Sequence, residues 1–469
     1  MFHFGLESYL YLAFPAVCVA AFLISIFRNP RVGLYVLVPL LPLQTVRYRL
    51  HAYPLGELFV DFMLLGIMLG LKRIGLPAFP KTQLNRLLAV YVVFTYVWLW
   101  RGMLYLGSAP PLWFDDRRLQ DWKNYVVMFL LMFLTASAIR TKRQMQFLLA
   151  AMAAGVFLLD RNYLATMSGR DFSQFSYSTR YAGAMGYAGE NGFAAFQAQT
   201  GTFLLGFLIA VPGLIAKTGA GFLLVMNVLC LVYALSRGGY AAFLFGCLFL
   251  GVTKNRLILV ALAAFLVSWQ ALVPPAVRER VYMTVGEEGM DHSAASRLGL
   301  WEEAMQVFDH DPVFGTGFNT YAYRENFGGF RDTHNMYVKV LVETGVIGIT
   351  IFLLLLWKMY SAGRRLYKTG RDPFFRGLGL AFAGLIASAA LVNVFGDRWT
   401  YLQVGGYTFV LLGLVIRAQQ IEDEEQEEEL EETAPEMLVE APSTAVPALW
   451  SEGIEPEPAE GNVHPQRYR

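Results

Sequence analysis

Residues 9–27 have the sequence YLYLAFPAVCVAAFLISIF, an uncharged and almost wholly apolar stretch. Similar stretches follow at 203–215, FLLGFLIAVPGLI, and at 346–357, VIGITIFLLLLW. A helix needs about 20 apolar residues to cross the roughly 30 Å hydrocarbon core of a bilayer. Only helices and closed barrels satisfy their backbone hydrogen bonds in lipid, and the alternating strands of a barrel are missing from the sequence. The sequence therefore predicts an all-α, polytopic transmembrane helix bundle.

The composition agrees with this prediction. Of the 469 residues, 55% are hydrophobic and only 16% are charged, whereas soluble chains carry about 25% charged residues. The first apolar stretch has neither a basic n-region nor a small-residue cleavage site, so we expect a span and not a removable signal. About 12–13 spans are expected, at 9–27, 32–46, 55–71, 84–106, 122–139, 145–160, 191–216, 219–235, 238–252, 257–273, 336–357, 376–395 and 400–417.

Basic residues gather on alternate loops, as expected for the cytoplasmic side of a polytopic membrane protein. The basic loops lie at 28–31, 72–73, 140–143, 254–256 and 364–368. The remaining loops, at 47–54, 107–121, 161–190, 236–239 and 274–335, are then periplasmic. Thirteen spans would place Met1 outside, whereas twelve would place it inside, and the sequence leaves this open.

The chain divides into four predicted parts: helices with short periplasmic loops (1–273), a large periplasmic loop (274–335), C-terminal helices (336–420) and a cytoplasmic tail (421–469). In the large loop, Trp301, Ala304, Met305 and Phe308 recur at helical spacing, which predicts one or two helices on the outer membrane surface. The tail is rich in Glu, Pro and Ala, and such a composition predicts disorder.

The sequence lacks the motifs of several common kinds of catalytic and binding site. Cys18, Cys230 and Cys247 lie in apolar segments and show neither disulfide nor metal spacing, so we expect small core residues. No phosphate-binding loop, zincin motif or paired-carboxylate motif is present. The sequence predicts no cofactor, no metal and no nucleic-acid partner.

Four groups on the predicted periplasmic side could carry chemistry. They centre on Arg180, before Gly183, Glu190 and Asn191; on Arg237, in Ser236-Arg237-Gly238-Gly239; on Arg297, near Trp301; and on His334, in Asp332-Thr333-His334-Asn335-Met336-Tyr337. Arginine is disfavoured in outer loops and is costly at the membrane boundary unless it is paired or hydrated. Its planar fork matches phosphate oxygens, and histidine titrates near neutral pH. The groups together suggest a diphosphate site with a general base.

Each group also has a simpler interpretation. Arg237 could anchor lipid headgroups or cap a helix. Arg180 and Arg297 could form salt bridges to Glu190, Glu302 or Asp291, and His334 could be a solvated loop residue beside Asp332. Spacing alone does not choose between these interpretations.

At these residues the chain resembles the O-antigen ligase and polymerase superfamily. The matching elements are Ser236-Arg237-Gly238, Arg297-x-Gly-x-Trp301, Pro312-x-x-Gly315-x-Gly317, His334-Asn335-x-Tyr337 and Glu343-x-Gly345-x-x-Gly348. Arg180-x-x-Gly183 with Asn191 is similar to the family's upstream arginine element. The resemblance covers about 180–350, and the opening Arg28-Asn29-Pro30-Arg31-x-Gly33 is similar to ligase-like members associated with exosortases.

The resemblance implies a metal-independent, inverting glycosyltransferase on the periplasmic face. The donor would be a glycan on undecaprenyl diphosphate, and the acceptor a hydroxyl of lipid A core, of a protein or of another glycan. Arg180, Arg237 and Arg297 would bind the diphosphate and stabilise its growing charge. His334 would activate the acceptor, with Asp332, Asn335, Tyr337 and Trp301 as supporting residues.

Two alternatives remain open at this point. A polymerase of the same superfamily would extend lipid-linked glycan, whereas we favour a ligase because of the long outer loop. An anion or small-solute transporter would need charges near the bilayer midplane, for which Asp61, Asp160 and Asp397 are the acidic candidates.

Overall fold

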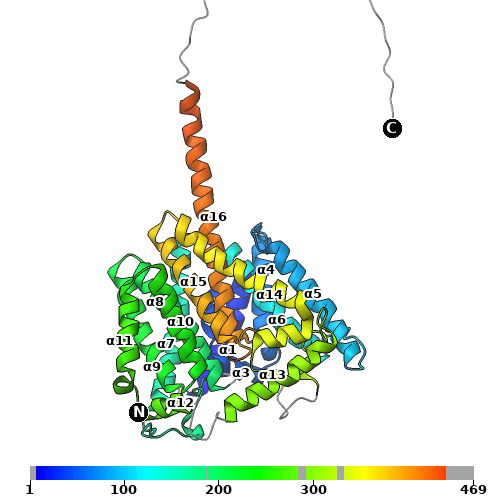
Figure 1. Ribbon diagram of the computed structural model, residues 1–469. Helices are drawn as coiled ribbons and strands as arrows, with labels where there is room; N and C mark the ends of the chain where they lie inside the picture. Colours follow the sequence, from blue (N-terminus) through cyan, green and yellow to red (C-terminus); the bar gives the residue numbers. More distant parts are fainter. Residues whose placement is uncertain (1–6, 186–188, 284–291, 325–331, 440–469) are drawn as a thin grey trace, which may run out of the picture. The chain divides into compact units, whose positions relative to one another are not determined.

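The computed structural model describes residues 7–185, 189–283, 292–324 and 332–439. These residues are helices joined by loops, with 78% of the described residues helical and no strand among them (Figure 1). The prediction of an all-α polytopic membrane protein is confirmed.

A helix overlaps each predicted span. These helices are α1 (Glu7–Phe27), α2 (Arg31–Leu40), α4 (Phe59–Arg73), α5 (Asn85–Tyr105), α6 (Arg117–Ala138), α7 (Lys142–Met167), α8 (Glu190–Ala210), α9 (Leu214–Tyr233), α10 (Arg237–Thr253), α11 (Leu257–Leu272), α14 (Met336–Thr369), α15 (Pro373–Val392) and α16 (Leu402–Val439). Shorter elements are α3 (Gln44–Tyr48), α12 (Pro275–Tyr282), α13 (His292–His310), η1 (Arg49–Ala52), η2 (Gly56–Leu58), η3 (Tyr177–Thr179) and η4 (Thr320–Ala322).

The number of helices that are long and apolar enough to cross a membrane is smaller than expected. Seven of the described helices qualify, namely α5, α7, α8, α9, α14, α15 and α16, or eight if the bent pair α11–α12 counts as one span. The difference arises because the described part of α1 (Leu12–Phe27), α2, α4 and α10 are each shorter than 18 residues, and because the first turns of α6 carry Arg117, Arg118, Asp121 and Lys123.

The centre of the bundle is formed by α8, α15 and the apolar half of α16, in which 72%, 78% and 83% of the apolar window is buried, compared with 28% in α9. α15 packs against α8, α10 and α14, and α8 packs against α9 and α10. These buried central helices form the core of the bundle and position the loops at their ends.

The two predicted sets of loops form two separate groups. On the predicted periplasmic side, the Thr45 amide donates to the Met185 carbonyl, and the Ala276 amide to the Phe172 carbonyl. On the other side, Arg73 donates to the Arg28 carbonyl, and Lys142 pairs with Asp372. The alternation derived from the basic residues therefore agrees with the way the loops meet.

The large loop contains two helices. α12 starts at Pro275 after a bend of 111° from α11, and α13 carries the predicted helical repeat around Trp301. Residues 284–291 and 325–331 of this loop lie outside the described part.

The acidic segment differs from its prediction. α16 continues to Val439, past residue 421, where the disordered tail was expected to begin. Glutamate is a good helix former, and Glu422 accepts hydrogen bonds from the Arg371 and Asp372 amides. The contacts divide the chain after Asp423, and the part of the tail from 440 onward lies outside the described residues.

Candidate functional site

Two of the predicted arginines line one small cavity of about 20 Å³. Arg237 is the first residue of α10, directly after the turn at Leu235, whose φ is 51°. Arg297 comes from α13. Arg280, from α12, and Arg398, from the loop between α15 and α16, complete the set of four arginines in the lining. We call the space that these four residues line the arginine cavity.

Arg180 adjoins this cavity through Asn191. Its Nη2 donates to Asn191 Oδ1 at 2.9 Å, and the Ser236 hydroxyl donates to the same oxygen at 2.8 Å. Asn191 and Ser236 both line the arginine cavity. The three arginines selected from the sequence are thus brought to one place.

The predicted salt bridge of Arg180 is also present, with 3.8 Å between its Nη2 and Glu190 Oε2. Burial lowers the pKa of Arg180, the Glu190 charge raises it, and the Arg280 charge lowers it again. An arginine side chain does not lose its proton in a protein, so Arg180 and Arg280 remain two buried positive charges that repel each other. An anion bound between them would reduce this repulsion.

α12 delivers Arg280 to the cavity. The Glu279 carboxylate accepts a hydrogen bond from the Phe175 amide at 2.6 Å, which fixes α12 to the segment before η3. The Arg280 guanidinium then lies 4.9 Å from the Phe175 ring centroid and 5.5 Å from that of Tyr177, and only 4% of Arg280 is exposed. Such cation–π contacts orient the fork while leaving its edge for hydrogen bonds.

Arg398 is 7% exposed. Its amide donates to Asn393 Oδ1 at 3.0 Å, which holds the loop after α15. Within the described residues, no carboxylate pairs with the Arg398 guanidinium. A buried, unneutralised cation is costly, and a bound anion would remove this cost.

Local hydrogen bonds hold the residues around His334. His334 has φ 51°, an uncommon conformation for a residue other than glycine. Asp332 holds it there, because its Oδ1 accepts from the His334 amide at 2.5 Å and lies 2.9 Å from His334 Nδ1. Burial would raise the pKa of Asp332, but the hydrogen bonds and charge of His334 outweigh it and lower the pKa to about 2.

The other supporting residues brace the same loop. Trp301 Nε1 donates to the Thr333 carbonyl at 2.9 Å, so α13 is tied to the histidine loop. Asn335 caps α14 by accepting from the Tyr337 and Val338 amides, and the Tyr337 hydroxyl donates to the Ala390 carbonyl. Trp301 therefore holds the backbone next to His334, Asn335 fixes the start of α14, and Tyr337 ties α14 to α15.

Asn393 connects the histidine loop with the loop that carries Arg398. Its carbonyl accepts from the Met336 amide at 2.8 Å, while its side chain accepts from the Arg398 amide. The positions of the base candidate and of one wall of the arginine cavity are thus coupled.

The glycines of the remaining motifs have a structural role. At Gly345 (φ 64°), α14 is broken, and a Cβ there would lie 2.1 Å from the Val313 carbonyl oxygen. The Thr316 and Gly317 amides donate to carbonyls of residues 342 and 343 at this break. The motif at 312–317 therefore docks into the break in α14 and positions the segment that follows.

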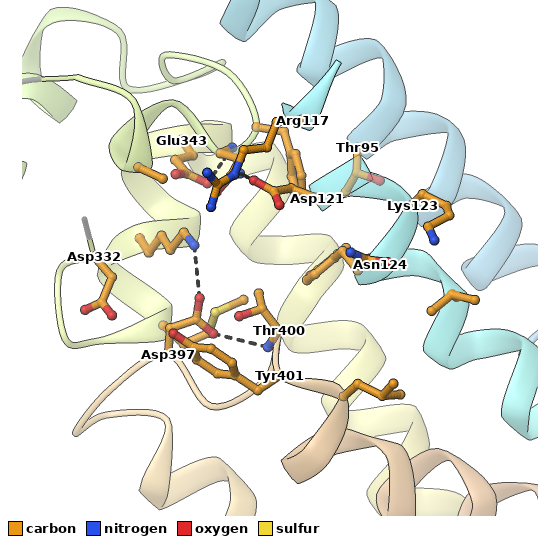
Figure 2. A pocket seen from close by; sticks show the side chains of 18 of the residues that line it. Thr95, Arg117, Asp121, Lys123, Asn124, Asp332, Glu343, Asp397, Thr400 and Tyr401 are labelled. Atoms are coloured by element: carbon orange, nitrogen blue, oxygen red, sulfur yellow. Dashed lines mark hydrogen bonds and ion pairs between the residues drawn. The ribbon is translucent and has the colours of Figure 1, made fainter. Parts of the chain in front are cut away.

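A second and much larger cavity, of about 1340 Å³, lies between α6 and α14 (Figure 2). Asp332 lines it, as do Asp121 and Asn124 of α6 and Lys339 and Glu343 of α14. Two consecutive residues line different cavities: Asp397 lines the large cavity and Arg398 lines the arginine cavity. We call the large cavity the polar chamber.

Sequence reasoning missed Arg280 and Arg398. Arg280 lies in the predicted periplasmic loop 274–335, where the topological argument that selected the other arginines applied equally, and Arg398 lies in the short connection between the predicted spans 376–395 and 400–417. Neither belongs to a recognised motif, and Asp397 was noted only as a possible transport residue.

Comparison with known proteins gives two matches. Residues 222–353 match the family model described as O-antigen ligase. The chain is also 24% identical over 300 residues to the exopolysaccharide production protein ExoQ of Rhizobium meliloti (strain 1021). That alignment covers 59% of this chain and 63% of the relative, so the match spans less than two thirds of the relative's length. Arg237, Arg280, Arg297 and His334 fall inside the family match, and Arg180 and Arg398 fall outside it.

Proposed function

We propose that this chain, a member of the O-antigen ligase superfamily, transfers a glycan from undecaprenyl diphosphate to an acceptor hydroxyl on the periplasmic face of the inner membrane. The observation that carries the proposal is the arginine cavity, in which Arg237, Arg280, Arg297 and Arg398 line one space. Four guanidinium groups at the end of a membrane bundle suit a lipid diphosphate, because each fork can bind two phosphate oxygens.

The arginines would act most strongly on the departing diphosphate. As the bond between the sugar carbon and the phosphate oxygen breaks, negative charge grows on the leaving group. Fixed cations that face this charge stabilise the transition state more than the ground state. The space between the arginines, about 20 Å³, has room for about one water molecule, so the guanidinium groups must move apart to admit a diphosphate. The contacts of Arg280 with the aromatic rings and of Arg180 with Asn191 then direct these groups toward it.

His334 would activate the acceptor. Asp332 holds Nδ1, so Nε2 would take the proton of the acceptor hydroxyl while the acceptor oxygen bonds to the anomeric carbon. The lipid diphosphate leaves from the opposite side, which inverts that carbon. Asp332 would then stabilise the imidazolium by its charge. These steps need no metal and no nucleotide.

A ligase and a polymerase would share these steps and differ in the acceptor. We favour a ligase that uses lipid A core or a protein, on the basis of the long loop at 274–335. The printed name of the relative, an exopolysaccharide production protein, supports a polymerase that extends lipid-linked glycan as the second candidate.

The test is a reaction of the purified protein with undecaprenyl-diphosphate glycan in the presence of EDTA. Lipid A core, a candidate acceptor protein, or donor alone is supplied in separate reactions. Transfer to either of the first two identifies a ligase, and longer lipid-linked glycan identifies a polymerase. Absence of product with every acceptor would reject the proposal.

A further inference from the structure

A polar network lies in the interior of the bundle, outside the linings of the arginine cavity and the polar chamber. It joins Asp160 of α7, Gln197 of α8 and Asn227 of α9, and each of these residues is 0% exposed. All three helices are long and apolar enough to cross a membrane. Polar and ionisable side chains inside such helices are costly and usually have a function.

Gln197 connects the other two members of the network. Its Nε2 donates to Asp160 Oδ1 at 2.6 Å, and its Oε1 accepts a hydrogen bond from Asn227 Nδ2. The Cys230 thiol, one turn after Asn227 on α9, donates to the Asp160 main-chain carbonyl at 3.6 Å. The network therefore ties three helices together.

Two oxygens of the network are left over. Within the described residues, Asp160 Oδ2 and Asn227 Oδ1 have no hydrogen-bond partner. A Cβ added at Gly201 would lie 2.5 Å from Asn227 Oδ1 and 3.1 Å from the Phe243 ring. The backbone of α8 and the Phe243 ring thus closely cover this oxygen, which leaves little room for a hydrated metal ion.

No side-chain cation balances a charge on Asp160. Among the described residues, no lysine, arginine or histidine forms an ion pair with it. The titratable groups that face it are the Cys230 thiol and the Tyr163 hydroxyl, one turn further along α7. Neither of these two groups can supply a positive charge.

The charged and titratable residues of the neighbouring helices lie elsewhere. Arg161 follows Asp160 in the chain but is exposed. α7 packs against α2 and α9; Tyr35 of α2 packs on Phe147, near the start of α7, and Tyr233 of α9 packs on Phe172, beyond its end. The other such groups stand near helix ends or bond distant backbone, namely Arg31 at the start of α2, Lys217 near the start of α9, Glu190 beside Arg180 at the start of α8, and Tyr407 of α16, which donates to the Met152 carbonyl.

An ionised carboxylate without a partner is very costly in such a place, and a buried acid commonly becomes neutral instead. A protonated carboxyl also has one O–H donor. One added proton therefore removes the charge and supplies a donor for the acceptor that lacks one, Asn227 Oδ1.

We propose that Asp160 is a proton-binding site inside the bundle, where its neutral carboxyl donates a hydrogen bond from Oδ2 to Asn227 Oδ1. The proton closes a ring in which each side chain donates to the next, from Asp160 to Asn227, from Asn227 to Gln197 and from Gln197 back to Asp160. Hydrogen bonds in such a closed chain strengthen one another.

The ring fastens helices whose ends carry residues of the arginine cavity. Gln197 shares α8 with Asn191, which accepts from Arg180, and α9 leads into the turn before Arg237. The inference does not depend on the proposed function, because it concerns the protonation and the hydrogen bonds of the resting protein.

Infrared difference spectroscopy of the full chain in lipid nanodiscs tests the protonation. At neutral pH, the difference between wild type and Asp160→Asn should show the carbonyl band of a protonated carboxyl group. The difference between wild type and Asp309→Asn, an exposed control on α13, should not. Gln197→Leu, which lacks the donor to Asp160 Oδ1, should shift this band without removing it. Carboxylate bands in place of the carbonyl band, or a band that Gln197→Leu leaves unmoved, would overturn the proposal.

Thermal unfolding distinguishes a proton from a metal ion. The amide of Asp160→Asn can accept from Gln197 and donate to Asn227, so this variant should melt close to the wild type, in sodium chloride and in choline chloride alike. Asp160→Leu can do neither and should melt at a lower temperature than Asp160→Asn. Stabilisation of the wild type by sodium that is lost in Asp160→Asn would assign a metal ion to the site and overturn the proposal.

A second measurement applies if Asp160→Asn does not fold. Wild type labelled with carbon-13 at the aspartate side-chain carboxyls should show an isotope shift of the protonated-carboxyl band, and Gln197→Leu should move the same band. Absence of either shift would overturn the proposal.

Discussion

Replacing Asp332 by asparagine removes one charge next to the proposed base and little else. Asparagine has nearly the same shape, and its side-chain oxygen can still accept from the His334 amide, which now bonds Asp332 Oδ1 at 2.5 Å. The histidine loop should therefore keep its conformation, so that the change reports on charge.

The size of the effect follows from the pKa of Asp332. The hydrogen bonds and charge of His334 outweigh burial and lower this pKa from 3.8 to about 2. One pKa unit corresponds to about 1.4 kcal/mol, so the net interaction is about 2–3 kcal/mol. If it acts fully on the imidazolium that forms during transfer, we expect Asp332→Asn to lower kcat about 10–100-fold with an unchanged KM for the donor.

The pH dependence follows from the sign of the same shift. A carboxylate with a lowered pKa stabilises the fold above its ordinary pKa, and the effect is lost as the pH falls through the folded value. With a pKa of about 2, Asp332 stays charged from pH 5 to 8, so titration of Asp332 itself should not contribute to the pH dependence of transfer in this range.

The assay is the initial rate of glycan transfer by purified protein at saturating donor, with Asp309→Asn, an exposed position on α13, as the control. Both variants should melt within a few degrees of the wild type. A rate for Asp332→Asn within twofold of Asp309→Asn would refute the electrostatic role of Asp332.

Three further predictions concern other parts of the molecule. Arg280→Lys should raise the donor KM or lower kcat at least tenfold in the transfer assay, because the fork held by the two aromatic rings is lost, whereas Arg278→Lys on the same helix should not. Gly345→Ala should destabilise the fold by more than about 1–3 kcal/mol, measured by thermal unfolding, because of its positive φ and the contact with the 313 carbonyl, whereas Gly219→Ala meets no atom within 4 Å. Truncation after residue 423, which keeps the Glu422 hydrogen bonds, should leave the transfer rate unchanged.

Each of these predictions has an outcome that contradicts it. Equal kinetics for the two lysine variants would reduce Arg280 to a structural residue. Equal melting temperatures for the two glycine variants would mean that the break in α14 is not required. Loss of transfer by a stably folded truncated protein would assign the acidic tail a role in the reaction.

The helices were predictable because lipid imposes one strong requirement, long apolar segments, and basic loops fix their alternation. Their ends were less predictable, since tertiary contacts decide them. α14 is an example, because the sequence predicts a continuous span over 336–357, whereas docking of the 312–317 segment breaks the helix at Gly345. The extension of α16 was missed because composition does not distinguish an exposed glutamate-rich helix from a disordered tail.

The site was predictable only as far as motifs marked it. Arg180, Arg237, Arg297 and His334 stood out because glycines or polar residues surround them at the ends of predicted spans. Arg280 joins Arg237 and Arg297 only after the chain bends by 111° between α11 and α12. No local sequence pattern predicts this bend between α11 and α12, or the arginine cavity that Arg280 completes.

In the proposed reaction His334 takes the acceptor proton while the arginines hold the lipid diphosphate. The most direct measurement is release of undecaprenyl diphosphate in a single turnover, with donor and acceptor both present, by the wild type and by His334→Ala at equal amounts of folded protein. We expect the variant still to bind donor but to release lipid diphosphate at least about 10²-fold more slowly. Release at the wild-type rate by His334→Ala would contradict it.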